Sequence, residues 1–220
     1  MIIAFDTYYY DGYSYTVGGI FESWASNNAS YYVTSKRKCT DAEYDSGELY
    51  KLSCIMQCIS MIKLDNIDAI IINGFAWLSD DGKELVKGLG AKLFNSIKVI
   101  YGNEIDVIGI SKSKYHVQIP NCLEVTHGIE CKVPLYITCS NIENTNHYSV
   151  LVSRMHGDFR IPTILRLIDT KARELKGERE KTNEIGMDFT DLDEWADREL
   201  KLSNFNEWMK ETEKNGFRCL

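Results

Sequence analysis

The sequence predicts an α/β fold in which an antiparallel three-strand meander and further parallel strands form one mixed sheet flanked by helices. Two observations predict it. Three N-terminal segments alternate apolar and polar residues and are separated by short turns containing Asp11-Gly12 and Asn27-Asn28. Beyond residue 50, helical patterns alternate with short apolar runs, which is typical of strands joined by crossover helices.

The elements follow from the apolar spacing, taken in chain order. The expected meander strands are "IIAFD" at 2–6, "YSYTVGGIF" at 13–21 and "SYYVTS" at 30–35. A helix is expected next, because apolar residues recur at helical intervals. These residues are Leu52, Ile55, Met56, Ile59 and Ile62. A buried strand at 67–72, an amphipathic segment with Leu85, Leu89 and Leu93 on one stripe, and a strand at 105–110 continue the chain. This order fits the ribonuclease H-like architecture.

The rest of the first 177 residues adds one strand and two helices. "VPLYITCS" at 133–140 is expected to be a strand, and residues 143–156 a helix. A second helix is expected from "RIPTILRLIDTKARELKG", in which Pro162 suits the first turn and Gly177 ends the pattern. We therefore assign residues 1–177 to one domain.

Residues 178–220 differ in character and are assigned to an acidic helical C-terminal extension. They carry a net charge of −5, against −2 for residues 1–177. Two short amphipathic helices are expected there, on apolar groups that are seldom left exposed. Those groups are Leu192, Trp195, Ala196, Phe205, Trp208 and Met209. The extension is expected to pack on the domain or to bind a protein partner.

Composition argues against several classes of protein. No apolar stretch approaches the length of a membrane span, and Met1 runs into "IIAFD" without a signal-peptide pattern, so a cytoplasmic location and no membrane partner are expected. The seven cysteines include no CxxC pair, which favours free, mostly buried thiols over disulfides or zinc. The four histidines form no HExxH spacing.

The charge distribution limits how the chain could bind nucleic acid. The formal net charge is −7, whereas strong nonspecific binding usually needs a positive domain. Local basic clusters at 36–38, 112–114 and 171–176 leave specific, shallow binding possible. Each cluster taken alone is also compatible with an ordinary solvated surface.

Two polar residues stand at the ends of predicted neighbouring strands. Asp6 ends the first strand and Asn73 follows the central apolar run, and these two ends should lie side by side in such a sheet. Carboxylates placed in this way can hold Mg²⁺, which polarises a phosphodiester and activates water. A strand-end aspartate can equally serve only to form a turn.

Six stretches in order resemble the endonuclease V family, whose members cleave nucleic acid one phosphodiester beyond an inosine. The resemblance covers residues 1–177 and is closest to the short bacterial relatives. The stretches are "FDTYYYDGYSYTVGGIFESW" at 5–24, "YDSGELYKLSCI" at 44–55, "IIINGFAWLSDDGK" with "GLGAKL" at 70–93, "VIGISKSKY" at 107–115, "VPLYIT" at 133–138 and "RMHGDFRIPTILRLID" at 154–169.

The resemblance implies roles for individual residues and a cofactor. Asp6 matches the first metal-binding aspartate of a Mg²⁺ or Mn²⁺ site, and Lys112 matches the lysine expected near the scissile phosphate. Asp169 falls on an acidic position of the same site, although it could instead pair with Arg166 or Arg173. The resemblance also implies a DNA-repair nuclease acting on inosine-containing DNA or RNA.

The departures from the family pattern weaken the implied metal site. Asn73 stands where the family has its second metal-binding aspartate, so it is a weak ligand at best. The helix glutamate is either deleted or replaced by Ser53, and Glu48 is a weak, offset substitute. Losing carboxylates should weaken Mg²⁺ binding severely, because each unit charge is worth roughly 4 kcal/mol gross at about 4 Å.

The nucleic-acid contacts implied by the resemblance also depart from the pattern. Residues 44–47 match the family's strand-separating wedge, in which Tyr44 and Gly47 are retained while Asp45 and Ser46 replace an apolar residue and a proline. Gly74 is the other expected contact with nucleic acid, beside Lys112. Three interpretations stay open: an endonuclease V-like hydrolase with a degenerate site and weak or lost activity, a catalytically inactive nucleic-acid-binding protein on the same fold, and an interaction module whose extension binds a partner or covers the groove.

Overall fold

The three N-terminal segments form the predicted meander in the computed structural model, which describes residues 1–39, 47–129 and 131–177. Strands β1 (Ile2–Tyr10), β2 (Tyr13–Phe21) and β3 (Tyr31–Lys38) pair antiparallel in that order. The β1–β2 turn places Asp11 and Gly12 at φ 49° and 70°. Positive φ at both central residues matches the right-handed twist of a two-residue hairpin, which explains why this turn sets the register.

Further strands extend the sheet beyond β1, partly in parallel. They are β4 (Ala69–Asn73), β7 (Asp106–Ser111), β9 (Leu135–Cys139) and β8 (Leu123–Val125), and the helices are α2 (Glu48–Ile59), α3 (Leu89–Tyr101), α4 (Thr145–Ser153) and α5 (Thr163–Glu174). The seven-stranded sheet has the order β3-β2-β1-β4-β7-β9-β8. Strands β1, β4 and β7 are parallel neighbours, and the other pairs are antiparallel. The predicted ribonuclease H-like mixed sheet is therefore confirmed.

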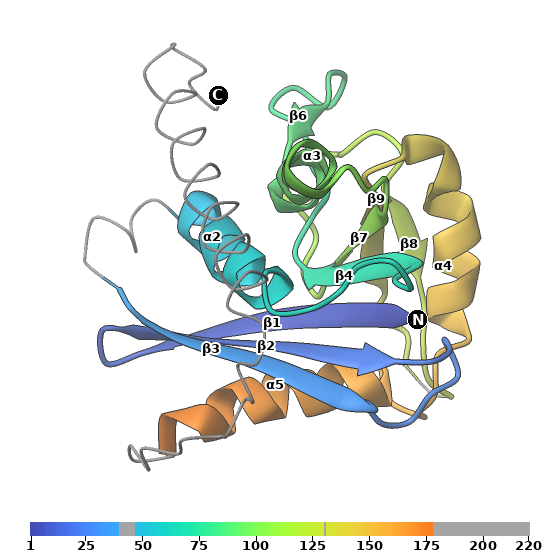
Figure 1. Ribbon diagram of the computed structural model, residues 1–220. Coiled ribbons are helices and arrows are strands. Elements are labelled where there is room, and N and C mark those ends of the chain that lie inside the picture. Colours follow the sequence, from blue (N-terminus) through green and yellow to red (C-terminus); the bar gives the residue numbers. More distant parts are fainter. Residues whose placement is uncertain (40–46, 130, 178–220) are drawn as a thin grey trace.

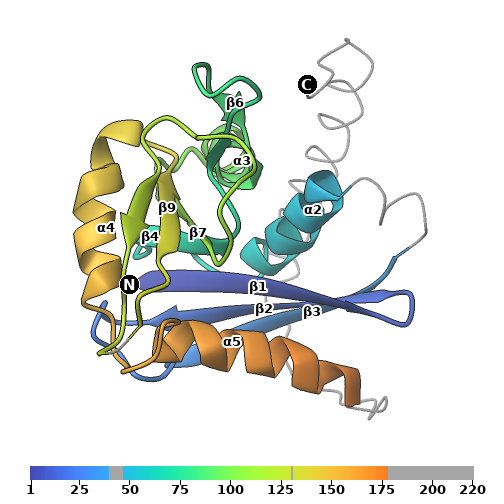
Figure 2. The ribbon, with the colours of Figure 1, turned by 180° about the vertical axis from the view of Figure 1, so that it is seen from behind.

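Two apolar cores lie on opposite faces of this sheet. Helices α4 and α5 cover one face and α2 and α3 cover the other (Figures 1 and 2). On β1, Ile2 and Ala4 belong to the core under α4 and α5, whereas Ile3 and Phe5 belong to the core under α2 and α3. This alternation follows from the two-residue period of a strand. Both faces are buried, which explains the continuous apolar run of β4.

The segment between β4 and α3 differs from the prediction. Leu85 was expected on the same helical stripe as Leu89, but the helix begins at Leu89. Residues before it form a short hairpin, β5 (Trp77–Leu78) with β6 (Val86–Lys87). The physical reason is a turn: the Asp81 carboxylate accepts hydrogen bonds from the backbone N–H groups of Lys83 and Glu84, so helical spacing at Leu85 is overridden.

The structure also bears on the cysteines, on an additional strand and on membrane spans. Cys54, Cys58 and Cys139 are buried thiols, whereas Cys122 and Cys131 are only partly buried. Strand β8 was not anticipated, since its three residues are too short to show a period. No described helix is both long enough and apolar enough to span a membrane. The expected helices of 178–220 lie outside the described residues.

Candidate functional site: a groove at the strand ends

Three parallel strands deliver polar side chains to one end of the sheet. Ala4 on β1, Ile71 on β4 and Ile110 on β7 all face the α5 side. The residues two positions later, Asp6, Asn73 and Lys112, keep this direction because side chains alternate along a strand. The polar residues thus lie at the ends of the three strands, directly beyond the apolar core on this face of the sheet.

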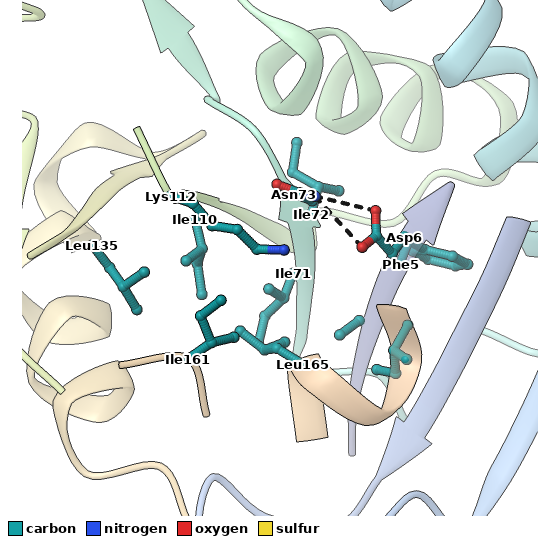
Figure 3. A pocket seen from close by; sticks show the side chains of 12 residues that line it. Phe5, Asp6, Ile71, Ile72, Asn73, Ile110, Lys112, Leu135, Ile161 and Leu165 are labelled. Atoms are coloured by element: carbon teal, nitrogen blue, oxygen red, sulfur yellow. Dashed lines mark hydrogen bonds between the residues drawn. The ribbon is translucent and has the colours of Figure 1, made fainter. Parts of the chain in front are cut away.

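These residues line one narrow cavity of about 30 Å³, which we call the strand-end groove. Asp6, Asn73 and Lys112 form its polar part, and Ile161, Leu165 and Ile168 close it from the α5 side. Figure 3 shows the Lys112 amine extending toward the space between Asn73 and Asp6. The sequence-based expectation that Asp6 and Asn73 lie side by side is confirmed by this geometry.

Asp6 is buried and its carboxylate is fully engaged by neighbours. It accepts hydrogen bonds from the backbone N–H of Thr7 at 2.8 Å and from Asn73 Nδ2, at 3.2 Å to Oδ1 and 3.5 Å to Oδ2. Burial raises the pKa of Asp6, whereas the positive charge of Lys51 and these hydrogen bonds oppose the rise. Asn73 therefore acts toward Asp6 as a donor, a role that an aspartate could not fill.

Asp169 approaches the same groove from α5. Its carboxylate interacts with Asp6, and it also accepts bonds from Arg173 Nε and Nη2 at 3.1 Å each. Partial burial tends to raise the pKa of Asp169, but Arg173 and the charge of Lys112 lower it below the ordinary value. The expected alternative that Asp169 pairs with Arg173 is confirmed, whereas its role in the site stays a prediction that its interactions with Asp6 and Lys112 support.

The sequence did not single out Lys51, which is a central residue of the groove's rim. Its Nζ donates a hydrogen bond to the backbone carbonyl of Asn73 at 2.8 Å. Burial lowers the pKa of Lys51, while the negative charges of Asp6 and Glu48 raise it. The sequence signal that could have identified Lys51 is its place three residues after Glu48, on the same side of α2.

The two α2 residues that the sequence analysis considered, Ser53 and Glu48, form their side-chain contacts outside the groove. Ser53 accepts a hydrogen bond from Arg37 Nη1 on β3 at 3.0 Å and donates one to the Tyr50 carbonyl. Two residues along an α-helix turn by about 200°, so Ser53 and Lys51 face opposite sides of α2 and Ser53 is not directed toward the strand ends. Glu48 forms an ion pair with Lys92 Nζ on α3 at 3.0 Å.

The backbone around Lys112 is anchored from the segment before α5. Arg160 Nη2 donates hydrogen bonds to the carbonyl oxygens of Lys112 and Pro134, the latter at 2.7 Å. His127 is buried, and its ring nitrogens lie 2.6 Å and 2.8 Å from the carbonyl oxygens of Phe159 and Met155. These contacts fix the segment that leads into α5, and thereby the position of Asp169.

A second cavity lies beside the groove, on the other side of residue 74. It measures about 180 Å³ and is lined by residues that include Phe75, Tyr115 and Tyr136. For comparison, a cavity of about 150 Å³ admits benzene. Gly74 adopts φ 137°, a conformation that favours glycine, and it lets the chain turn from β4 toward this cavity.

Two further residues, Tyr44 and Gly47, were expected to contact nucleic acid, and the structure describes only Gly47. Tyr44 lies outside the described residues. Gly47 precedes α2 at φ 56°, and its carbonyl accepts a hydrogen bond from the Lys51 backbone N–H at 3.2 Å. Whether either residue contacts nucleic acid stays a prediction.

The donor set does not fit a divalent cation. Within residues 1–39, 47–129 and 131–177, no group of three or more His, Cys, Asp or Glu side chains is placed to hold a metal ion. The two carboxylates at the groove, Asp6 and Asp169, face three cationic side chains, Lys51, Lys112 and Arg173. Mg²⁺ requires anionic oxygen ligands, and these oxygens are already occupied by nitrogen donors.

Comparisons with known proteins give a consistent fold. No family model matches the sequence, and no curated protein matches it. The structure resembles endonuclease V of Ciona intestinalis in complex with a 24mer DNA containing an inosine followed by a ribo-adenosine, with a TM-score of 0.58, 14% identity, and coverage of 81% of this chain and 86% of that chain. It also resembles endonuclease V of Bacillus subtilis, with a TM-score of 0.50, 18% identity, and coverage of 80% and 79%. About four fifths of this chain therefore has an endonuclease V-like fold.

Proposed function

We propose that this chain is a nucleic-acid-binding protein on an endonuclease V-like fold, and that it holds a backbone phosphate in the strand-end groove with weak or no hydrolysis. The observation that carries this proposal is the charge of the groove. Lys112 lines the groove, and Lys51 and Arg173 act on its carboxylates Asp6 and Asp169 from outside the lining. Such a site attracts an anion such as phosphate more readily than a metal cation.

A surface next to the groove supports the proposal. Register places Tyr8 opposite Tyr15 and Tyr10 opposite Tyr13, so these four rings share the face of the sheet that carries Asp6. Tyr15 is buried, Tyr8 and Tyr13 are half-buried, and Tyr10 is exposed. Four basic groups lie on this face or over its rings, and they are Lys36, Lys38, Arg173 and Lys176. Aromatic rings beside cations suit single-stranded nucleic acid, because bases stack on the rings while phosphates meet the charges.

We infer a preference for inosine, which the endonuclease V-like fold and the second cavity support. The Ciona neighbour binds DNA that contains inosine. The cavity lined by Phe75 and Tyr115 lies next to the groove and has room for an aromatic ring. We therefore expect an inosine-containing strand to bind more tightly than a matched strand with guanosine.

Fluorescence anisotropy with labelled single-stranded and duplex oligonucleotides tests the binding. Matched oligonucleotides carry one inosine or one guanosine at the same position, and the titration is repeated over a range of salt. Saturable binding that weakens with salt is expected. An absence of saturable binding at low salt to every oligonucleotide would exclude the proposal.

Residual Mg²⁺- or Mn²⁺-dependent hydrolysis is the second candidate, and the contact between the carboxyl groups of Asp6 and Asp169 favours it. Gel cleavage of the single-inosine oligonucleotide with either metal distinguishes the two functions. An Asp6→Ala variant controls for contaminating nuclease. Robust wild-type cleavage that this variant abolishes would establish the hydrolase.

A further inference from the structure

Lys51 closes a chain of polar contacts at the end of β4. Its Nζ contacts the Asn73 carbonyl at 2.8 Å, and the amide of the same Asn73 donates to the Asp6 carboxylate. Lys51 also interacts electrostatically with Asp6 and with Glu48. The Lys51 ammonium thus binds the backbone at the end of β4, and the charges of Asp6 and Glu48 both act on it.

The Lys51 ammonium can take the electrostatic role that a metal cation would have at this place. It has three N–H donors, of which one is directed to the Asn73 carbonyl, so the others are available to anionic oxygens nearby. It brings one positive charge with it when the chain folds. A divalent cation binding to Asp6 and Asp169 would have to displace the hydrogen bonds that these carboxylates accept from Asn73 and Arg173. The positive charges of Lys51 and Lys112, which already act on the two carboxylates, would oppose it.

We propose that the Lys51 ammonium supplies the positive charge that a divalent cation would otherwise bring to the strand-end groove, so that the groove binds a nucleic-acid phosphate without metal. The proposal deepens the nucleic-acid-binding function given above and rests on it for the identity of the ligand. Lys51 is supplied by α2, whereas Lys112 directly follows β7 and lines the groove. A phosphate between them would be held by two fixed charges.

The first test measures metal binding by the full-length protein alone, without nucleic acid. Mn²⁺ is titrated and followed by electron paramagnetic resonance and by thermal unfolding. The wild type is expected to show no stoichiometric Mn²⁺ site and no rise in melting temperature. The double variant Lys51→Glu with Asn73→Asp is expected to bind one Mn²⁺ and to gain thermal stability from it, because a cation is exchanged for two carboxylates.

Ser53→Glu with Asn73→Asp is the matched control on the same helix. It adds the same two carboxylates but leaves Lys51 in place, and residue 53 faces Arg37. It is expected to gain no Mn²⁺ site. Stoichiometric Mn²⁺ binding by the wild type, or equal gains in the two double variants, would overturn the proposal.

The second test measures nucleic-acid affinity in the presence of a chelator and then of Mg²⁺. The wild-type dissociation constant is expected to be the same in both, whereas Lys51→Met is expected to weaken binding roughly tenfold and to lower the salt slope by about one. Lys51→Met keeps an unbranched side chain that is one atom shorter and carries no charge, and circular dichroism checks its fold. Wild-type binding that requires Mg²⁺ would overturn the inference, while a failure of all binding would count against the proposed function and leave the Mn²⁺ result to decide the role of Lys51.

Discussion

At the scale of single residues, the substitution of an amide for a carboxylate decides how the strand-end groove is held together. Asn73 can donate a hydrogen bond to Asp6, whereas an aspartate can only accept one. A buried carboxylate without donors is costly, so the amide contributes to the stability of Asp6 in its ionised form. The buried Asp6 carboxylate therefore depends on the neutral amide of Asn73.

We predict that Asn73→Asp alone destabilises the protein by about 1–3 kcal/mol, because it removes a donor to Asp6 and puts a second carboxylate beside it. Urea unfolding at neutral pH measures the change. Asn73→Ala serves as the comparison, since it removes the donor without adding charge. An Asn73→Asp protein as stable as the wild type would mean that Asp6 does not depend on this amide.

Lys112 offers a separate test of the groove. We predict that Lys112→Ala weakens oligonucleotide binding about equally for inosine and guanosine strands and lowers the salt slope by about one, as expected for a phosphate contact. The control is Lys98→Ala, since Lys98 pairs with Glu104 near the end of α3, at the opposite ends of the parallel strands. A loss confined to the inosine strand would assign Lys112 to base recognition instead.

At the scale of elements, close backbone approach places the residue 73–76 loop over β7. A Cβ added at Gly109 would lie 2.5 Å from the Ala76 nitrogen and 2.8 Å from the Gly74 carbonyl oxygen. The loop is further held by a hydrogen bond from the Ala76 N–H to the Thr138 hydroxyl at 2.8 Å. Only a glycine at position 109 lets this loop lie against the strand.

We expect Gly109→Ala to lower the free energy of unfolding by about 1–3 kcal/mol, because the added methyl meets backbone atoms that cannot rotate away. Chemical unfolding gives the value. Ile110→Val on the same strand is the control and is expected to cost about 0.5–1.5 kcal/mol. If Gly109→Ala costs nothing, the loop has room to move and does not fix the groove.

The tyrosine-bearing hairpin formed by β1 and β2 can be tested as a binding element. Lys36 lies 4.8 Å from the centre of the Tyr13 ring, and Lys176 lies 5.1 Å from that of Tyr10. We predict that Lys36→Ala with Lys176→Ala lowers the salt slope of oligonucleotide binding by about two and leaves the inosine preference unchanged. An unchanged slope would restrict binding to the groove itself.

At the scale of the whole molecule, the acidic residues are unevenly shared between the domain and the C-terminal extension. Among the described residues, the domain supplies two apolar cores. The extension lies outside the described residues, and it carries most of the formal negative charge of −7. Its charge opposes the approach of a polyanion.

We predict that deletion of residues 178–220 leaves the domain folded and raises its affinity for single-stranded oligonucleotides. Thermal unfolding followed by circular dichroism and anisotropy titrations measure the two effects. Hydrogen exchange of the full chain tests the sequence-based expectation that Trp195 and Trp208 lie in packed helices. An extension that is unprotected throughout, together with unchanged affinity after deletion, would contradict both a packed extension and a cover over the groove.

The sequence by itself determined the N-terminal meander, the later strands β4, β7 and β9, and the meeting of Asp6 with Asn73. Periodicity carries this information, because a strand of period two repeats its direction at every second residue. Lys112 was identified through the resemblance to endonuclease V and not through periodicity. The resemblance of six short stretches was sufficient to anticipate the fold that the solved structures share.

Only the tertiary structure decided which α2 side chain reaches the strand ends. Lys51 and Ser53 are both polar and lie two residues apart, so the choice between them depends on the rotation of the helix against the sheet, which is set by contacts such as that of Leu52 with the core. The hairpin of β5 and β6 likewise depends on the Asp81 turn rather than on apolar spacing. A short-range sequence pattern indicates the direction of a side chain within its own helix or strand. The charge of a groove depends on residues from several elements, and only tertiary packing brings these residues together.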